Sequence, residues 1–150
     1  PSVTKAGQIC TISGVQSAAH SQPSTAVRCG SYSPGYFKTI SHWPGYTANR
    51  TNPSYSIRTL SRGTIGFNRN TSFSAVFGGG LNVSLINILL NQPNTAEFHW
   101  IGALLSAIAA PSGYVYPYAP GEVIDLYNSA QQAAALNFIK TTMESRDQVV

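Results

Sequence analysis

An apolar stripe at helical spacing predicts the longest helix in the second half of the chain. Its members are Phe98, Ile101, Leu105 and Ile108. Asn94 can cap the start of this helix with Glu97 as its third residue, a variant of the capping box. Small residues cover the other faces, so a second element can approach closely there: Gly102, Ala103, Ser106, Ala107 and Ala110. We therefore expect this helix to be buried around most of its circumference.

Shorter helices are predicted on both sides of it. An apolar run over residues 83–90 predicts one that ends before Pro93, because a proline disfavours helix in the residue that precedes it. Pro120 suits the first position of another helix. A last helix is predicted over about residues 131–143, and residues 145–150 have the pattern of a frayed tail.

The first half lacks helical periodicity and is punctuated by Gly and Pro, so it predicts turns and short extended pieces. Residues 9–12 and 64–67 are the only short strands that its pattern supports. The three glycines at 78–80 lack a phosphate-loop pattern and predict a flexible joint. The expected fold is mainly α (α+β): a single domain over residues 1–150, with a loop-rich half packed on a small helical half and residues 1–15 as an extended arm.

Two cysteines, Cys10 and Cys29, lie in a segment rich in Ser, Gly and Pro. A disulfide between them would staple the N-terminal half and stabilise it by roughly 3 kcal/mol; two unrelated buried thiols are the alternative. Such a bond needs an oxidising compartment. Because the chain also opens at Pro1 rather than Met, we expect a removed targeting segment and an extracellular or cell-surface location. The chain has no run of about 18 apolar residues, so no membrane span is expected.

The chain is poor in charge. Only 9 % of its residues are charged, against roughly 25 % in a typical soluble protein. The surface must therefore consist largely of Ser, Thr, Asn, Gln, Gly and Tyr. Such a surface repels copies of itself weakly, so it suits a protein that lives packed against its own kind.

The charges divide the chain into two halves of opposite sign. Residues 1–96 carry seven basic residues and no acidic one, whereas residues 97–150 have a net charge of −3, which together give the total of +4. Three interpretations stay open: a face that binds a polyanion, a head-to-tail contact between the basic end of one subunit and the acidic end of the next, or arginines scattered over a solvated surface. The basic residues are too widely spaced for a local nucleic-acid patch, so nucleic acid is not an expected partner.

Catalysis needs titratable groups that converge, and this chain has few. The histidines at positions 20, 42 and 99 show no metal-ligand spacing, and a G-x-S-x-G motif is absent. Glu97 and Glu122 are explained as residues of helix first turns. We therefore expect no enzymatic activity, no catalytic residue, no cofactor and no metal; an exported hydrolase is the least favoured alternative.

Four segments, in chain order, carry a resemblance. They are Ser33-Pro-Gly-Tyr-Phe-Lys-Thr39 with His42-Trp43-Pro44, Phe73-Ser-Ala-Val-Phe-Gly78, His99-Trp-Ile-Gly-Ala-Leu-Leu-Ser-Ala107, and Tyr116 with Glu122-Val-Ile-Asp-Leu-Tyr-Asn128. They resemble the T-P-G-Y-W-K-x-H-x-x-x-W-P, F-x-x-x-F-G, H-x-x-A-A-L-L-N-A and Y-x-x-x-x-x-E-V-I-x-x-x-N motifs of bacterial secreted or surface proteins of uncharacterised function. Phe37, Gly102 and Ser106 depart from the usual Trp, Ala and Asn. The resemblance implies export and a common core over about residues 33–128, and it transfers no catalytic residue.

Two histidines fall within the matched motifs and suggest a structural role. A buried imidazole at His42 beside Trp43, or at His99 beside Trp100, would pin the loop-rich half to the helical half. A metal site made of the two histidines is the less favoured alternative.

Two functions are expected from these observations. The first is an extracellular structural protein that self-assembles into a filament or surface layer, with copies of itself as its partner. The alternative is a secreted surface module that binds carbohydrate or a polyanion such as acidic polysaccharide. The ligand or interface surface would use aromatic and basic residues of the first half: Tyr36, Trp43, Tyr46, Arg50, Arg58 and Arg62.

Overall fold

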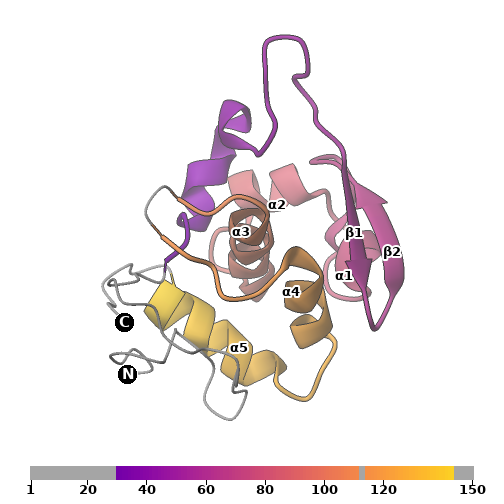
Figure 1. Cartoon of the computed structure of the whole chain (residues 1–150), viewed down its shortest axis with the longest axis vertical. Coiled ribbons are helices and arrows are strands. Elements are labelled where there is room, and N and C mark those ends of the chain that lie inside the picture. Colours follow the sequence, from indigo (N-terminus) through magenta and orange to yellow (C-terminus); the bar gives the residue numbers. More distant parts are fainter. Residues whose placement is uncertain (1–29, 112–113, 144–150) are drawn as a thin grey trace.

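The computed structural model describes residues 30–111 and 114–143 (Figure 1). Two 3₁₀-helices come first, η1 (Pro34–Lys38) and η2 (Ile40–His42), followed by the strands β1 (Tyr55–Thr59) and β2 (Gly63–Phe67). The α-helices are α1 (Phe73–Phe77), α2 (Leu85–Asn91), α3 (Ala96–Ile108), α4 (Pro120–Tyr127) and α5 (Gln132–Phe138), and a π-helical turn, η3 (Ile139–Met143), follows α5. The mixed α+β character is confirmed. Cys10, Cys29, the arm 1–15 and the strand 9–12 lie outside the described residues, as does the tail 145–150.

Helix α3 occupies the centre of the molecule, with η1, α2, α4 and α5 packed against it (Figure 1). Its predicted burial is confirmed, because consecutive residues from Trp100 to Ser106 are buried. The predicted cap is wrong by one residue: Thr95, not Asn94, precedes the helix, and its hydroxyl accepts a hydrogen bond from the Phe98 N–H at 3.3 Å. Both residue types can cap a helix, so the choice depends on where the chain turns into it.

Two small residues of α3 let η1 approach closely. A Cβ added at Gly102 would lie 2.9 Å from Cγ of Pro34, closer than real side chains pack. One turn later the buried Ser106 hydroxyl accepts a hydrogen bond from the Tyr32 N–H at 3.1 Å. Gly102 and Ser106 therefore let η1 and the residues just before it lie close to α3.

The strands β1 and β2 form a two-stranded antiparallel hairpin that pairs Tyr55 with Phe67 and Thr59 with Gly63. The prediction of a strand at 64–67 is confirmed, but limiting the strands of the first half to 9–12 and 64–67 was wrong, because β1 was missed. Ile57, Ile65 and Phe67 turn one face of the hairpin into the core. A hairpin of this size is marginal in water by itself, so its packing against the helices stabilises it.

The glycines at 78–80 form a packed turn and not the predicted flexible joint. Gly78 ends α1 with φ of 90°, a left-handed conformation that favours glycine. Gly80 also has a positive φ of 82°, and a Cβ there would lie 2.8 Å from Cε1 of Phe73. The guanidinium of Arg62 adds two hydrogen bonds, from Nη1 to the carbonyl oxygens of Ala75 at 3.1 Å and Val76 at 2.7 Å.

The remaining helices follow the sequence prediction closely. Pro120 is the first residue of α4, and the Glu122 carboxylate accepts a hydrogen bond from the Ala119 N–H at 2.7 Å. The apolar helix predicted over 83–90 is α2, shifted by one or two residues. The last predicted helix is divided, because α5 ends at Phe138 and continues as η3. Within residues 30–111 and 114–143, no helix has the length and apolar character needed to cross a membrane.

Candidate interaction surface

The aromatic residues expected on a ligand surface are mostly used inside the protein. Trp43 is only 2 % exposed, and its Nε1–H donates to the Phe37 carbonyl oxygen at 2.8 Å. Its ring meets Phe37 edge-on and lies near-parallel to Tyr55. The indole therefore has no open face on which a sugar could stack, so its assignment to a ligand surface is wrong.

Tyr36 is the central ring of a three-ring stack. Tyr32 lies parallel to it at a centroid distance of 3.9 Å, and the His42 imidazole at 4.0 Å. Two rings at these distances cannot share one side, so both faces of Tyr36 are covered. His42 is exposed and not buried, which corrects the expectation for that imidazole; its Nδ1 lies 2.8 Å from the Tyr36 carbonyl oxygen. The imidazole closes the stack on the surface and does not reach the core beside Trp43.

His99 is half-buried on α3, and its ring meets Phe98 edge-on at a centroid distance of 5.4 Å. The neighbouring Trp100 is buried and packs edge-on against Phe77 and Tyr127. Among the described residues, no group of three or more His, Cys, Asp or Glu side chains is arranged to hold a metal ion.

The four arginines of the first half that the structure describes fall into two groups. Arg62 binds the last carbonyls of α1, as described above, and Arg69 donates to the Thr51 carbonyl oxygen at 2.5 Å, so these two arginines support the fold. Arg50 and Arg58 are exposed, and in the described part of the chain neither has a hydrogen bond or ion pair from its guanidinium. Tyr46 is half-buried. Of the six expected surface residues, Trp43 is thus buried and Arg62 is engaged with α1, whereas Arg50 and Arg58 are exposed.

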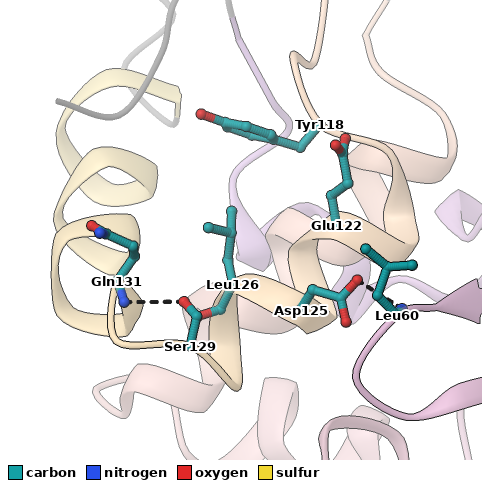
Figure 2. Close-up of a pocket in the computed structure, with 7 residues that line it drawn as sticks. All are labelled: Leu60, Tyr118, Glu122, Asp125, Leu126, Ser129 and Gln131. Atoms are coloured by element: carbon teal, nitrogen blue, oxygen red, sulfur yellow. Dashed lines mark hydrogen bonds between the residues drawn. The ribbon is translucent and has the colours of Figure 1, made fainter. Parts of the chain in front are cut away.

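A different surface stands out near the hairpin tip. Leu60 lies between β1 and β2 and is 96 % exposed. It borders an open hollow of about 300 Å³ between the tip, α4 and the connection from α4 to α5 (Figure 2). The hollow is lined by Leu60, Tyr118, Glu122, Asp125, Leu126, Ser129 and Gln131. Figure 2 shows the Leu126 side chain pointing toward Tyr118, so leucine and tyrosine side chains form much of its wall.

The carboxylate of Asp125 holds the hairpin tip in place. It accepts hydrogen bonds from the N–H groups of Leu60 at 2.9 Å and Ser61 at 2.7 Å, and from the Ser61 hydroxyl at 2.5 Å. Partial burial alone would raise the pKa of Asp125, but these hydrogen bonds outweigh it and lower the pKa below its ordinary value. The exposed Leu60 is therefore presented by a backbone anchored at two consecutive amides.

Both carboxylates of the hollow already serve as hydrogen-bond acceptors for backbone amides, since Glu122 caps α4 in the same way. Their charges are not balanced locally: within residues 30–111 and 114–143, neither Glu122 nor Asp125 forms an ion pair. The hollow thus combines an apolar wall with net negative charge.

Sequence reasoning missed Leu60. The available signal was an apolar residue inside a tight turn of polar neighbours, Thr59-Leu-Ser-Arg-Gly63. Such a residue has no helical or strand stripe to join, so the periodicity that found the other apolar positions passed over it.

Comparisons with protein-family models, with curated proteins and with solved structures found no match to this chain.

Proposed function

We propose that this protein is an exported structural subunit without enzymatic activity that self-associates through the hollow beside Leu60 into an extracellular filament or surface layer. The observation that carries the proposal is the 96 % exposure of Leu60, held by hydrogen bonds to Asp125 at the edge of an apolar hollow. A single exposed leucine is ordinary; what favours an interaction surface is that Leu60 is anchored beside the side chains of Leu126 and Tyr118.

Association supplies the burial that the isolated subunit lacks. Covering one fully exposed leucine is worth about 1.5–3 kcal/mol, and a contact that fills the hollow also covers Leu126 and Tyr118. The low charge fraction of 9 % works in the same direction, because copies of the chain repel one another weakly. The resemblance to bacterial secreted or surface proteins agrees with the proposed location.

The polysaccharide-binding alternative has less support. It depended on stacking by Tyr36 and Trp43 with arginines beside them, and Trp43 is buried while Tyr36 lies between two other rings. Of the arginines assigned to it, Arg50 and Arg58 keep free guanidinium groups in the described part of the chain. What remains of this alternative is a contact between a polyanion and these two arginines.

The test compares two leucine variants. Leu60→Ser removes the apolar side chain at the hollow, and Leu90→Ser makes the same change at an exposed leucine of α2 that is 52 % exposed and does not line the hollow. We expect the wild-type protein to form assemblies that grow with concentration in light scattering and analytical ultracentrifugation, and regular particles in negative-stain electron microscopy. Leu60→Ser should remain monomeric, whereas Leu90→Ser should assemble like the wild type.

Circular dichroism spectra and melting temperatures should match for the two variants, so that loss of assembly is not loss of fold. A wild-type protein that stays monomeric at high concentration across salt and pH would rule the proposal out. Retention of that monomer on acidic polysaccharide would then favour the binding module.

A further inference from the structure

The molecule carries a second feature that matches the hollow and lies far from it along the longest axis (Figure 1). The segment between η2 and β1 projects from the top of Figure 1, whereas the hairpin tip and α4, which border the hollow, lie in the lower half. A contact between these two features cannot form within one subunit. It can form between copies.

The projecting segment is an ordered turn. Thr47 and Arg50 exchange backbone hydrogen bonds, at 3.0 Å from the Thr47 N–H and 3.1 Å from the Arg50 N–H, and the Thr47 hydroxyl accepts a further bond from the Arg50 N–H at 3.0 Å. All four residues of the turn, 47–50, are exposed. Because the backbone is already fixed, binding through this turn costs little ordering entropy.

The chemistry of the turn complements that of the hollow. Arg50 is a cation without an ion pair in the described part of the chain, and the carboxylates of Glu122 and Asp125 are anions that likewise form no ion pair there. The three-carbon stem of an arginine side chain packs on apolar groups while its guanidinium reaches a carboxylate. Leu60, Leu126 and Tyr118 provide the apolar wall for such a stem.

The size of the hollow also fits a side chain from a turn. At about 300 Å³ it is at the lower limit of the roughly 300–1,000 Å³ usual for ligand pockets. The hollow is open to solvent and not enclosed.

We propose that the occupant of the hollow is the turn 47–50 of a second copy of this chain, with Arg50 directed at Glu122 and Asp125 against the apolar wall. This inference rests on the proposed function, since it names the partner surface of the same hollow. The contact is heterologous, because each copy uses its turn on one side and its hollow on the other. A heterologous contact whose rotation does not close a ring generates an open filament.

Charge reversal tests the assignment. Arg50→Glu places an acid against the two carboxylates, and we expect it to raise the concentration needed for assembly at least about tenfold, since like charges brought together at an interface are strongly unfavourable. Lys140→Glu is the matched control: it makes the same change in net charge at an exposed residue that does not line the hollow, and it should assemble like the wild type. The double variant Arg50→Glu with Glu122→Lys should recover assembly.

Glu122→Lys removes the acceptor that caps α4, so a second variant, Glu122→Gln, is tested in parallel. The amide oxygen of Gln can still accept the Ala119 N–H, and this variant should fold normally while assembling more weakly. Added salt should weaken wild-type assembly and have less effect on Glu122→Gln, because one opposite charge is missing.

Mixing two inactive variants tests the polarity of the contact. Leu60→Ser keeps its turn, and Arg50→Glu keeps its hollow, so an equal mixture should form one-to-one dimers that grow no further. Growth beyond dimers, or no association at all in the mixture, would overturn the head-to-tail assignment.

The outcomes separate the two proposals. If Leu60→Ser prevents assembly while Arg50→Glu assembles like the wild type, the hollow is an interface but the turn is not its occupant, and only this inference fails. If the wild type does not assemble, both fail.

Discussion

Replacing Gly121 by alanine tests the contact that holds α4 against the hairpin. A Cβ added at Gly121 would lie 2.0 Å from the Arg58 carbonyl oxygen and 3.0 Å from its carbonyl carbon. Contacting heavy atoms prefer separations of about 3.5–4.0 Å, so α4 and β1 would have to move apart by on the order of 1.5 Å. The obstacle is backbone on both sides, and no side-chain rotation can relieve it.

We expect Gly121→Ala to destabilise the protein by about 3 kcal/mol, which is at the upper end of the loss in stability that overpacking substitutions usually cause. For a chain of this length that corresponds to a fall of about 6–12 °C in melting temperature, measured by circular dichroism or differential scanning fluorimetry. The separation would also strain the hydrogen bonds from the hairpin tip to Asp125, so assembly through the hollow should weaken at temperatures where the variant is still folded.

The chain contains a matched control. Gly35 follows Pro34 in η1 as Gly121 follows Pro120 in α4, and a Cβ added at Gly35 would meet no atom within 4 Å. Gly35→Ala should therefore leave stability unchanged or raise it by up to about 1 kcal/mol, because alanine restricts the unfolded chain more than glycine. A Gly121→Ala protein that melts at the wild-type temperature would refute the close approach of α4 to β1.

Three further predictions follow from individual side chains. The hydrogen bonds to Asp125 lower its pKa in the folded protein below the ordinary value of 3.8. They therefore stabilise the folded state fully above pH 3.8, and this stabilisation is lost as the pH falls through the pKa of the folded state. Melting temperatures of wild type and Asp125→Asn should therefore converge below pH 3.8, and a constant difference down to the acid limit would contradict this. Burial raises the pKa of Tyr55 from 10.0 to about 12 despite the opposing charge of Arg69. The unfolded chain thus ionises first, stability should fall between those values, and Tyr55→Phe should flatten the fall in alkaline melting curves; an equal fall in the variant would exclude Tyr55 as its cause. Trp43→Ala should cost about 3–5 kcal/mol in urea unfolding, as for a large core residue, and a loss below about 1 kcal/mol would contradict its burial.

The helices of the second half could be predicted because their signals are local. A stripe at 3.6-residue spacing marks α3, and a proline at the first position marks α4. Strand β1 carried a readable alternation as well, with Ile57 facing the core and Arg58 facing solvent. Five residues that follow a stretch of turn-forming residues are ambiguous until a partner strand is known, and for that reason β1 was missed.

The candidate site could not be predicted in the same way. Tyr36 and Trp43 are aromatic residues of a kind found both on ligand surfaces and in cores, and only their neighbours distinguish the two. Arg62 and Arg50 carry the same charge, yet the first binds helix carbonyls and the second projects on a turn. Residue type states what a side chain can do, and its surroundings determine what it does.

Composition, charge asymmetry and the helical character of the second half follow from the sequence alone, because each is a sum or a short-range pattern. Only the tertiary structure determines which side chains are buried and that Leu60 is exposed at the hairpin tip. Contacts between distant residues made that decision: the Tyr32 amide meets Ser106, 74 positions away, and the Ser61 amide meets Asp125, 64 positions away. Burial is a property of neighbours in space, and no pattern within a short window of sequence specifies which neighbours those will be.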